Sequence, residues 1–253
     1  MKVTFLGTGT SQGVPIIGCK CIVCTSTNPK DNRLRTSVMI EVNDKRFVID
    51  TGPDFRQQML TEKVDNLTAV IYTHEHRDHV AGMDDLRAFN YVLGRRIDLY
   101  ATIKTQTSLK EQFSYAFSEN KYPGIPEVNL HTIENKPFTI EGVEFKPILV
   151  KHMYLDVLGF RIGDFTYITD ANAISDEEKK KVTGSQIVVL NALRREPHPS
   201  HFTFAEAVQL AQELKCKTTY LTHISHQLGL HDEVEKEMPP AIKLAYDGLS
   251  LIL

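Results

Sequence analysis

The sequence contains few cysteines, no long apolar run and no strong excess of charge. Its 253 residues include four cysteines, and three of them stand within six positions, too close together to make good disulfide partners. No segment approaches the roughly 18–20 apolar residues of a membrane span, and the start MKVTFLGTG has too short an apolar run for a signal peptide. These absences argue against a disulfide-stapled secreted domain and predict a cytoplasmic protein that makes no membrane contact.

The balance of charge also limits the kinds of partner that the protein is expected to bind. The net charge is -3, with 42% hydrophobic and 24% charged residues, which is ordinary for a soluble globular protein. This balance argues against a surface that grips nucleic acid by charge, but it allows a small anionic substrate held by a few local cations. Because no linker rich in proline, glycine or serine divides the chain and no repeat is present, we expect one domain over residues 1–253.

Short runs rich in β-branched residues recur along the chain, and helical patterns are fewer, which predicts an α/β fold. The predicted strands are residues 3–6, 37–42, 46–49, 67–72, 97–100, 143–148, 159–162, 166–169, 187–190 and 218–221. The predicted helices are residues 53–60, 109–117, 175–181 and 203–214. Hairpin turns are expected at residues 43–44 and 163–164. Residues 119–127 form the most loop-like stretch and are expected to be a surface connection.

The run His74-Glu75-His76-Arg77-Asp78-His79 has the spacing HxHxDH. Its first two histidines are two residues apart, so in an extended segment they point the same way. The motif follows the predicted strand, at the carboxyl end where α/β folds build their sites. Imidazoles mixed with a carboxylate suit a metal site that keeps a position open for water. Because the four groups do not easily reach one small ion together, we expect them to serve two adjacent ions.

Four further residues follow apolar strands in the same manner. His152 follows an apolar run, while Asp50, Asp170 and His223 stand where predicted strands end. Each alone is a common polar residue at a strand end. Together they repeat one arrangement, in which a residue able to bind a metal stands where an apolar strand stops.

A second motif lies near the start of the chain. Cys19, Cys21 and Cys24 have the spacing CxCxxC and follow the glycine-rich run GTGTSQG at residues 7–13. Thiolates at such short spacing suit a closed structural zinc site, which usually has four nitrogen or sulfur ligands. One chain with both motifs is therefore predicted to be a hydrolase with a catalytic metal centre and a separate structural zinc site.

The order HxHxDH, single His, strand-end Asp and late His resembles the metallo-β-lactamase superfamily. This resemblance implies an αββα sandwich with its metals at one edge. It implies that one metal is held by His74, His76 and His152, and the other by Asp78, His79 and His223. It further implies that Asp170 bridges the two metals and that Asp50 orients their ligands. Since the oxygen-reducing di-iron members tend to carry glutamate at the position of His76, the histidine favours the hydrolases.

CxCxxC after a glycine-rich loop resembles one branch of that superfamily, the PhnP-type phosphoribosyl cyclic phosphate phosphodiesterases. This resemblance implies that His226 completes the structural zinc site of Cys19, Cys21 and Cys24. It also implies that His201 faces the leaving group, with His198 in the same loop as its competitor. Homodimer formation is implied by the family alone.

The sequence therefore predicts hydrolysis of a small or cyclic phosphodiester by a hydroxide that two divalent metals, Mn or Zn, hold and activate. Asp78 is expected also to orient this hydroxide, and His201 to give a proton to the departing oxygen. The alternatives are an RNase Z-like nuclease, a thioesterase or lactamase of the same fold, and a PqqB-like non-hydrolytic carrier. No long basic insertion offers tRNA a binding arm, and neither a thioesterase nor a lactamase requires CxCxxC.

Overall fold

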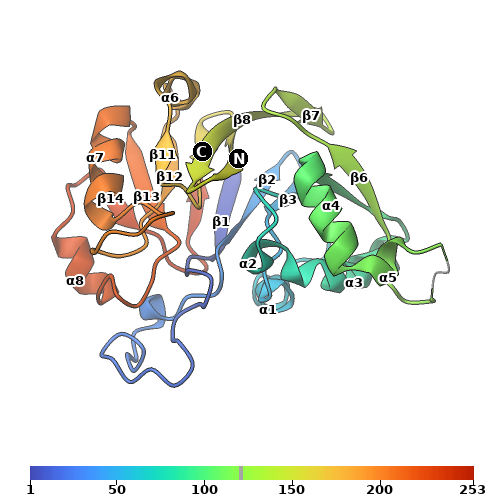
Figure 1. The fold of residues 1–253 in the computed structure, drawn as a ribbon, viewed down its shortest axis with the longest axis horizontal. Coiled ribbons are helices and arrows are strands. Elements are labelled where there is room, and N and C mark those ends of the chain that lie inside the picture. Colours follow the sequence, from blue (N-terminus) through green and yellow to red (C-terminus); the bar gives the residue numbers. More distant parts are fainter. Residues whose placement is uncertain (120–121) are drawn as a thin grey trace.

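The computed structural model describes residues 1–119 and 122–253, and its strands form two sheets that face each other, with helices outside both (Figure 1). The first sheet has the order β15-β1-β2-β3-β4-β5-β6, and the second has the order β11-β8-β9-β10-β12-β13-β14, with β7 paired to β8. The αββα sandwich expected from the sequence is confirmed.

The strands of the first sheet are β1 (Lys2–Gly7), β2 (Ser37–Val42), β3 (Lys45–Ile49), β4 (Ala69–Ile71), β5 (Ile97–Ala101), β6 (Val128–Thr132) and β15 (Ser250–Ile252). Those of the second are β7 (Phe138–Ile140), β8 (Val143–His152), β9 (Leu155–Ile162), β10 (Phe165–Tyr167), β11 (Ala173–Ile174), β12 (Ile187–Asn191), β13 (Thr218–Thr222) and β14 (Ile242–Leu244). The α-helices are α1 (Phe55–Thr61), α2 (Arg77–Val80), α3 (Arg87–Leu93), α4 (Ile103–Gln112), α5 (Ser114–Phe117), α6 (Asp176–Val182), α7 (Phe204–Leu214) and α8 (His231–Lys236). Short 3₁₀ helices span Pro29–Asp31 and Ala81–Leu86.

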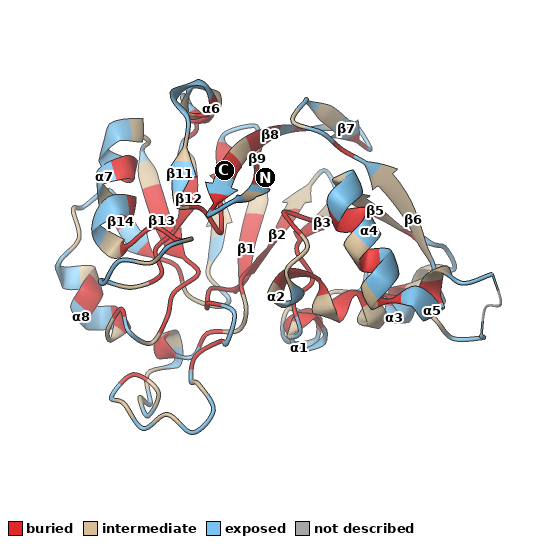
Figure 2. Ribbon diagram, in the orientation of Figure 1, coloured by how far each residue is buried: buried red, intermediate tan, exposed pale blue. Residues whose placement is uncertain are grey.

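The apolar core has three layers because both faces of each sheet are covered. Between the sheets, Phe47 of β3 meets Phe145 of β8 edge to face, with ring centroids 5.2 Å apart. Helices α1 to α5 pack on the outer face of the first sheet, and α6 to α8 on that of the second. Figure 2 shows the result, with buried residues along the central strands and exposed residues on the outer helix faces. Strands buried on both faces carry continuous apolar runs, which is why the sequence pattern found them.

Several local predictions are confirmed. Asn43 and Asp44 both have positive φ, 48° and 63°, as a two-residue hairpin turn between β2 and β3 requires. Gly163, with φ 55°, turns the chain between β9 and β10. Helix α7 begins at a capping box, in which Thr203 and Glu206 each bond the other's backbone N–H. This cap fixes the backbone two residues after His201.

The predicted helix over residues 109–117 is wrong in its bounds. Helix α4 begins at Ile103, where the Thr102 hydroxyl accepts a hydrogen bond from the backbone N–H of Thr105, and it ends at Gln112. Phe113 leaves the helical conformation before α5 begins. The sequence pattern also predicted none of β6, β7, β11, β14, β15, α2, α3 and α8. These are short elements, and the pairing of strands distant in sequence that stabilises several of them leaves little local pattern.

The loop expected over residues 119–127 contains positions 120 and 121, which lie outside the described residues. The described part runs beside α3, where Asn90 accepts a hydrogen bond from the backbone N–H of Glu127 at 2.9 Å. Cys216 is half buried at the edge of the core that α7 covers. Within residues 1–119 and 122–253, none of the helices has the length and apolar character needed to span a membrane.

Two candidate metal centres

Three of the predicted site residues follow their strands in the same strained conformation. Asp50 follows β3, Asp170 lies after β10 and His223 follows β13, and their φ angles are 65°, 52° and 56°. Residues other than glycine adopt this left-handed region at a cost of about 1–3 kcal/mol, and such residues cluster at functional sites. The strained turns bring three side chains from both sheets to one edge of the sandwich.

Close backbone packing sets the position of helix α2 beside these strand ends. A Cβ on Gly52 would lie 2.3 Å from the carbonyl oxygen of Asp78, so only glycine fits at this position. The N–H of Thr51 donates to the carbonyl of His79 at 2.8 Å. The HxHxDH segment is thereby held against the end of β3.

The first group of candidate ligands is His74, His76 and His152, whose ligand atoms lie within 4.8 Å of one another. Nε2 of His74 lies 3.0 Å from Nδ1 of His76. The ring of His152, at the end of β8, lies 5.2 Å from that of His76. The structure thus brings together the three residues expected to share one metal.

The second group is Asp78, His79, Asp170 and His223, again with ligand atoms within 4.8 Å of one another. Oδ1 of Asp170 lies 3.4 Å from Nε2 of His79 and 3.2 Å from Nε2 of His223. Its Oδ2 lies 3.9 Å from Nε2 of His74, on the side of the first group. Asp170 therefore stands between the two groups, where a bridging carboxylate was expected.

Hydrogen bonds on the outer side of the rings fix which nitrogen faces the site. Oδ2 of Asp50 accepts from Nδ1–H of His79 at 2.7 Å and from the Thr73 hydroxyl at 2.8 Å. Because the Thr73 hydroxyl donates to Asp50, it accepts from Nδ1–H of His74 at 2.9 Å. Nδ1–H of His152 donates to the carbonyl of Ser200 at 2.8 Å. In each ring Nε2 is therefore the nitrogen that faces the site.

The carboxylates dominate the electrostatics of the second group. Burial alone would lower the pKa of His223, but Asp170 and Asp78 outweigh it and raise that pKa to about 9. Burial likewise opposes a charged Asp170, yet His223 and His79 hold its pKa well below the usual range. In His74, burial, followed by the charge of His79, pushes the pKa well below normal. The second group is therefore built to hold positive charge, and the first keeps a neutral imidazole.

His201 lies beside both groups. Its ring centroid is 4.6 Å from that of His152 and 4.7 Å from that of His223. Burial, followed by the charge of His223, lowers the pKa of His201 to about 2. His198 lies farther out, 5.1 Å from the His201 ring. Of the two histidines in this loop, His201 is therefore the one packed against the candidate ligands.

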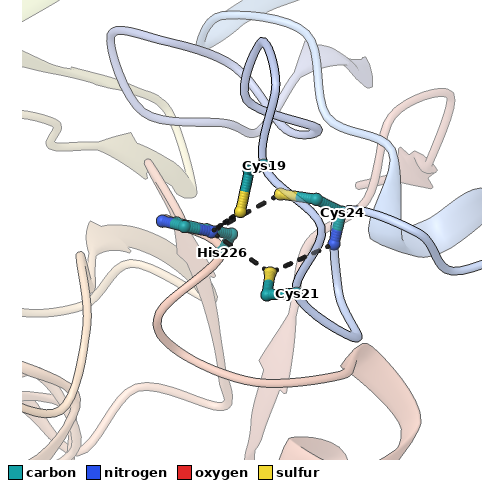
Figure 3. Close-up of side chains that lie close together, drawn as sticks. All are labelled: Cys19, Cys21, Cys24 and His226. Atoms are coloured by element: carbon teal, nitrogen blue, oxygen red, sulfur yellow. Dashed lines mark hydrogen bonds between the residues drawn. The ribbon is translucent and has the colours of Figure 1, made fainter.

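The cysteine cluster forms a separate site around His226, three residues after His223 (Figure 3). The Sγ atoms of Cys19, Cys21 and Cys24 lie 3.4, 3.3 and 3.4 Å from Nδ1 of His226. Two backbone N–H groups, of Cys24 and Ile16, donate to the sulfurs of Cys21 and Cys24. The bond from Cys24 N–H is the largest influence that lowers the pKa of the Cys21 thiol, to about 6, whereas burial raises that of Cys24 to about 11.

Both sites fit divalent cations. Around a tetrahedral zinc, sulfur and nitrogen ligands would stand roughly 3.6 Å apart, and the cysteine cluster is within a few tenths of an ångström of this spacing. At the other site, Nε2 of His79 and Nε2 of His223 are buried and have no hydrogen-bond partner among the described residues, although both face Asp170. Buried nitrogens without partners are costly, and a cation would satisfy them.

Two residues that support the candidate ligands were not predicted from the sequence. Thr73 links Asp50 to His74, and no pattern marks it. Asn191, at the end of β12, accepts from the N–H of Ala171 at 2.8 Å and donates to its carbonyl at 2.9 Å, which fixes the chain after Asp170. The rule that polar residues at strand ends build the site would have found Asn191. Arg33 is buried beside Asp247 and donates to Nδ1 of His231.

Comparison with known proteins identifies the class. The sequence profile of the β-lactamase superfamily domain matches residues 45–224, most of this chain. A structure described as a new diphosphatase from the PhnP family is 42% identical, with a TM-score of 0.94 over 100% of this chain and 97% of that one. The chain therefore belongs to the metallo-β-lactamase superfamily. Within this superfamily it is of the PhnP type.

Two other proteins are similar to this chain, one in sequence and one in fold. A Porphyromonas gingivalis protein named octanoyltransferase is 39% identical over 100% of this chain and 52% of its own length. The zinc-bound PqqB of Methylobacterium extorquens shares the fold, with a TM-score of 0.81 at 18% identity over the full length of both chains. The chain spans about half the length of the first of these curated relatives, and 37% of the Methylorubrum extorquens PqqB that it matches in sequence.

Proposed function

We propose that this protein is a metal-dependent phosphodiesterase that hydrolyses a small or cyclic phosphodiester of the phosphoribosyl 1,2-cyclic phosphate type. One observation carries the proposal: two groups of candidate ligands face each other across Asp170 at a single sheet edge. Such a pair of sites suits in-line displacement at phosphorus, where attacking and leaving oxygens both need charge stabilisation. The PhnP-type relatives support phosphate chemistry.

The proposed metal ligands are His74, His76 and His152 on one side, and Asp78, His79 and His223 on the other, with Asp170 between them. When bound, two divalent cations of the Mn or Zn type would draw a nucleophile from water near neutral pH and offset the charge of the phosphate. Asp50 and the Ser200 carbonyl keep Nε2 of His79 and His152 turned inward. Asp78 orients the attacking group.

His201 is the proposed proton donor to the departing sugar oxygen. Its buried position beside His152 and His223 puts the ring within reach of a substrate held at this edge. The ring is neutral before substrate binds, because burial depresses its pKa. A bound phosphate would favour the protonated ring by its negative charge. General acid catalysis of this kind typically contributes about 10²–10⁴-fold.

The rival functions require other substrates at the same site. The name of the Porphyromonas gingivalis relative makes octanoyl thioesters the first competitor, and that of the PhnP-family neighbour adds diphosphates. An RNase Z-like nuclease would cleave tRNA precursors, and a PqqB-like carrier would cleave nothing. The net charge of -3 speaks against a nucleic-acid substrate.

A substrate panel tests the proposal directly. Ribose cyclic phosphate, linear diesters, a monoester, a nucleoside diphosphate, an octanoyl thioester and precursor tRNA are each offered to protein loaded separately with Mn²⁺ and with Zn²⁺. We expect the highest kcat/KM on a phosphodiester. Faster cleavage of the thioester or diphosphate would move the protein to that class, and no turnover with full metal content would favour the carrier.

A variant pair then ties the activity to this site. Asp170→Ala removes the carboxylate between the two groups and is expected to abolish nearly all turnover. Asp156→Ala, on the exposed part of β9, removes a surface ion pair with Lys151 and is expected to keep it. Equal activity of the two variants would contradict the proposed centre.

A further inference from the structure

His201 takes part in a third group of candidate ligands that the general-acid role does not explain. Ligand atoms of His152, Asp170 and His201 lie within 4.8 Å of one another, and all three residues are buried. His201 is only 8% exposed, and its Nδ1 has no hydrogen-bond partner in the described part of the chain. A buried nitrogen without a partner is unfavourable, so the arrangement calls for a ligand.

The backbone around His201 is fixed to both other members of the group. The carbonyl of Ser200 accepts Nδ1–H of His152, and the N–H of Phe202 donates to the carbonyl of Ala171 at 2.7 Å, directly after Asp170. Ser200 and Phe202, on either side of His201, are therefore hydrogen-bonded to His152 and to the residue after Asp170. A set of two imidazoles and one carboxylate suits first-row divalent cations.

We propose that His152, Asp170 and His201 form a third cation position, used in place of the position lined by His74 and His76. The two positions exclude each other because both need Nε2 of His152, whose Nδ1 is already committed to Ser200. Asp170 serves either position with Oδ2, since its Oδ1 faces His79 and His223. The edge therefore holds two cations at a time, one of which has two alternative positions.

This inference rests on the proposed di-metal centre and adds a sequence of events to it. While a cation occupies the third position, the coordinating nitrogen of His201 cannot carry a proton. When the cation lies with His74 and His76, His201 is free to act on the leaving group. Movement of one cation between the two positions thus decides whether His201 acts as ligand or as proton donor.

The third cation position is tested by counting the metal ions that bind to a variant without His74 and His76. In His74→Ala/His76→Ala, the cation of the first group keeps only His152 and Asp170 unless His201 contributes. With zinc left in the cysteine cluster, Co²⁺ is titrated and followed by its visible absorption and by equilibrium dialysis. We expect two Co²⁺ per chain in this double variant and one after His201→Ala is added. His198→Ala is the matched control and should leave two.

Three results would overturn the inference. The double variant could bind one Co²⁺ whether His201 is present or not, or His198→Ala could act as strongly as His201→Ala. If the native chain bound no Co²⁺ at the His/Asp edge, the proposed function would fail as well. The first two results, in contrast, contradict only the third cation position. In case the double variant does not fold, the single variants are compared in the otherwise native chain at full Co²⁺ loading. His201→Ala should then change the absorption spectrum of the bound Co²⁺, because ions from the third position return to His74 and His76, whereas His198→Ala should leave the spectrum unchanged.

Discussion

At the residue scale, the candidate site depends on side chains that keep other side chains in one orientation. Asp50 is fully buried, and burial raises its pKa while His79 opposes this. It accepts from His79 and from both the N–H and the hydroxyl of Thr73. A carboxylate with these partners is positioned to hold the imidazole in one tautomer, and it has no room to reach substrate itself.

Asp50→Asn should therefore weaken the second cation without abolishing the fold. We expect the affinity at Asp78, His79, Asp170 and His223 to fall by about 10–100-fold, because loss of a group that orients a ligand typically costs this much. Competition titration with a coloured chelator measures it. Asp54→Asn, which touches Arg35 at the start of α1, is the control and should leave the affinity unchanged. Equal affinities in both variants would remove Asp50 from the orienting role.

The proposed proton-donor role of His201 predicts that the effect of its loss depends on the leaving group. A sugar alkoxide needs a proton to depart, whereas p-nitrophenolate leaves without one. At saturating metal, His201→Ala should slow a ribose cyclic phosphate by about 10²–10⁴-fold and bis(p-nitrophenyl) phosphate far less. His198→Ala should show no such difference. Equal losses on both substrates would mean that His201 positions the phosphate, and selectivity in His198→Ala would mean that His198 is the donor.

At the element scale, the cysteine loop and the segment after β13 form one unit. The loop stands apart from the body of the sandwich at the blue end of the chain (Figure 1). Its three cysteines connect it to His226, three residues after His223. Gly9 forms a bridge to Ile224, and the N–H of Ile224 donates to the carbonyl of Thr8 at 2.9 Å. A zinc ion at Cys19, Cys21, Cys24 and His226 would therefore fix the segment that carries His223, a proposed ligand of the di-metal centre.

Cys21→Ser should remove one zinc per chain and lower stability, since a structural zinc contributes folding free energy directly. We expect the melting temperature to fall by at least about 4 °C, the effect of about 2 kcal/mol at this chain length. Elemental analysis and calorimetry provide the measurement. Cys216→Ser, at the end of α7 and away from the cluster, should keep the zinc. Unchanged zinc content in Cys21→Ser would contradict the structural zinc site.

At the scale of the whole molecule, a buried charged network joins the two ends of the chain. Arg33 donates to the Thr8 hydroxyl, to the carbonyl of Ala245 and to Nδ1 of His231, at 2.8, 2.6 and 3.0 Å. Asp247 accepts from Thr8 and from the N–H of Leu34. Burial, reinforced by Arg33, lowers the pKa of His231 to about 4. The fold therefore needs His231 in its neutral form.

This network predicts a loss of stability in acid. In the unfolded chain His231 titrates near pH 6.5, and in the folded chain near pH 4. The contribution of the neutral ring is present above pH 6.5 and is lost as the pH falls to 4, by roughly 3 kcal/mol at most. His231→Asn keeps an acceptor for Arg33 and removes the titration. Denaturant unfolding from pH 7 to 4.5 should show a smaller loss for His231→Asn than for the native chain or for His131→Asn, a half-buried histidine on β6 that pairs with Asp98. Equal losses would contradict this account.

The sequence by itself determined the chemistry available to this protein. HxHxDH and CxCxxC are local patterns, so their spacing alone brings candidate ligands together, and apolar strands buried on both faces mark where the other ligands stand. Tertiary structure alone decided how these residues act. Thr73 and Ser200 hydrogen-bond candidate ligands, His201 packs against both groups of them, and Arg33 is buried in a network. Each of these depends on contacts between segments that are far apart in the chain or on the direction of a single hydrogen bond, and neither leaves a periodic trace in the sequence.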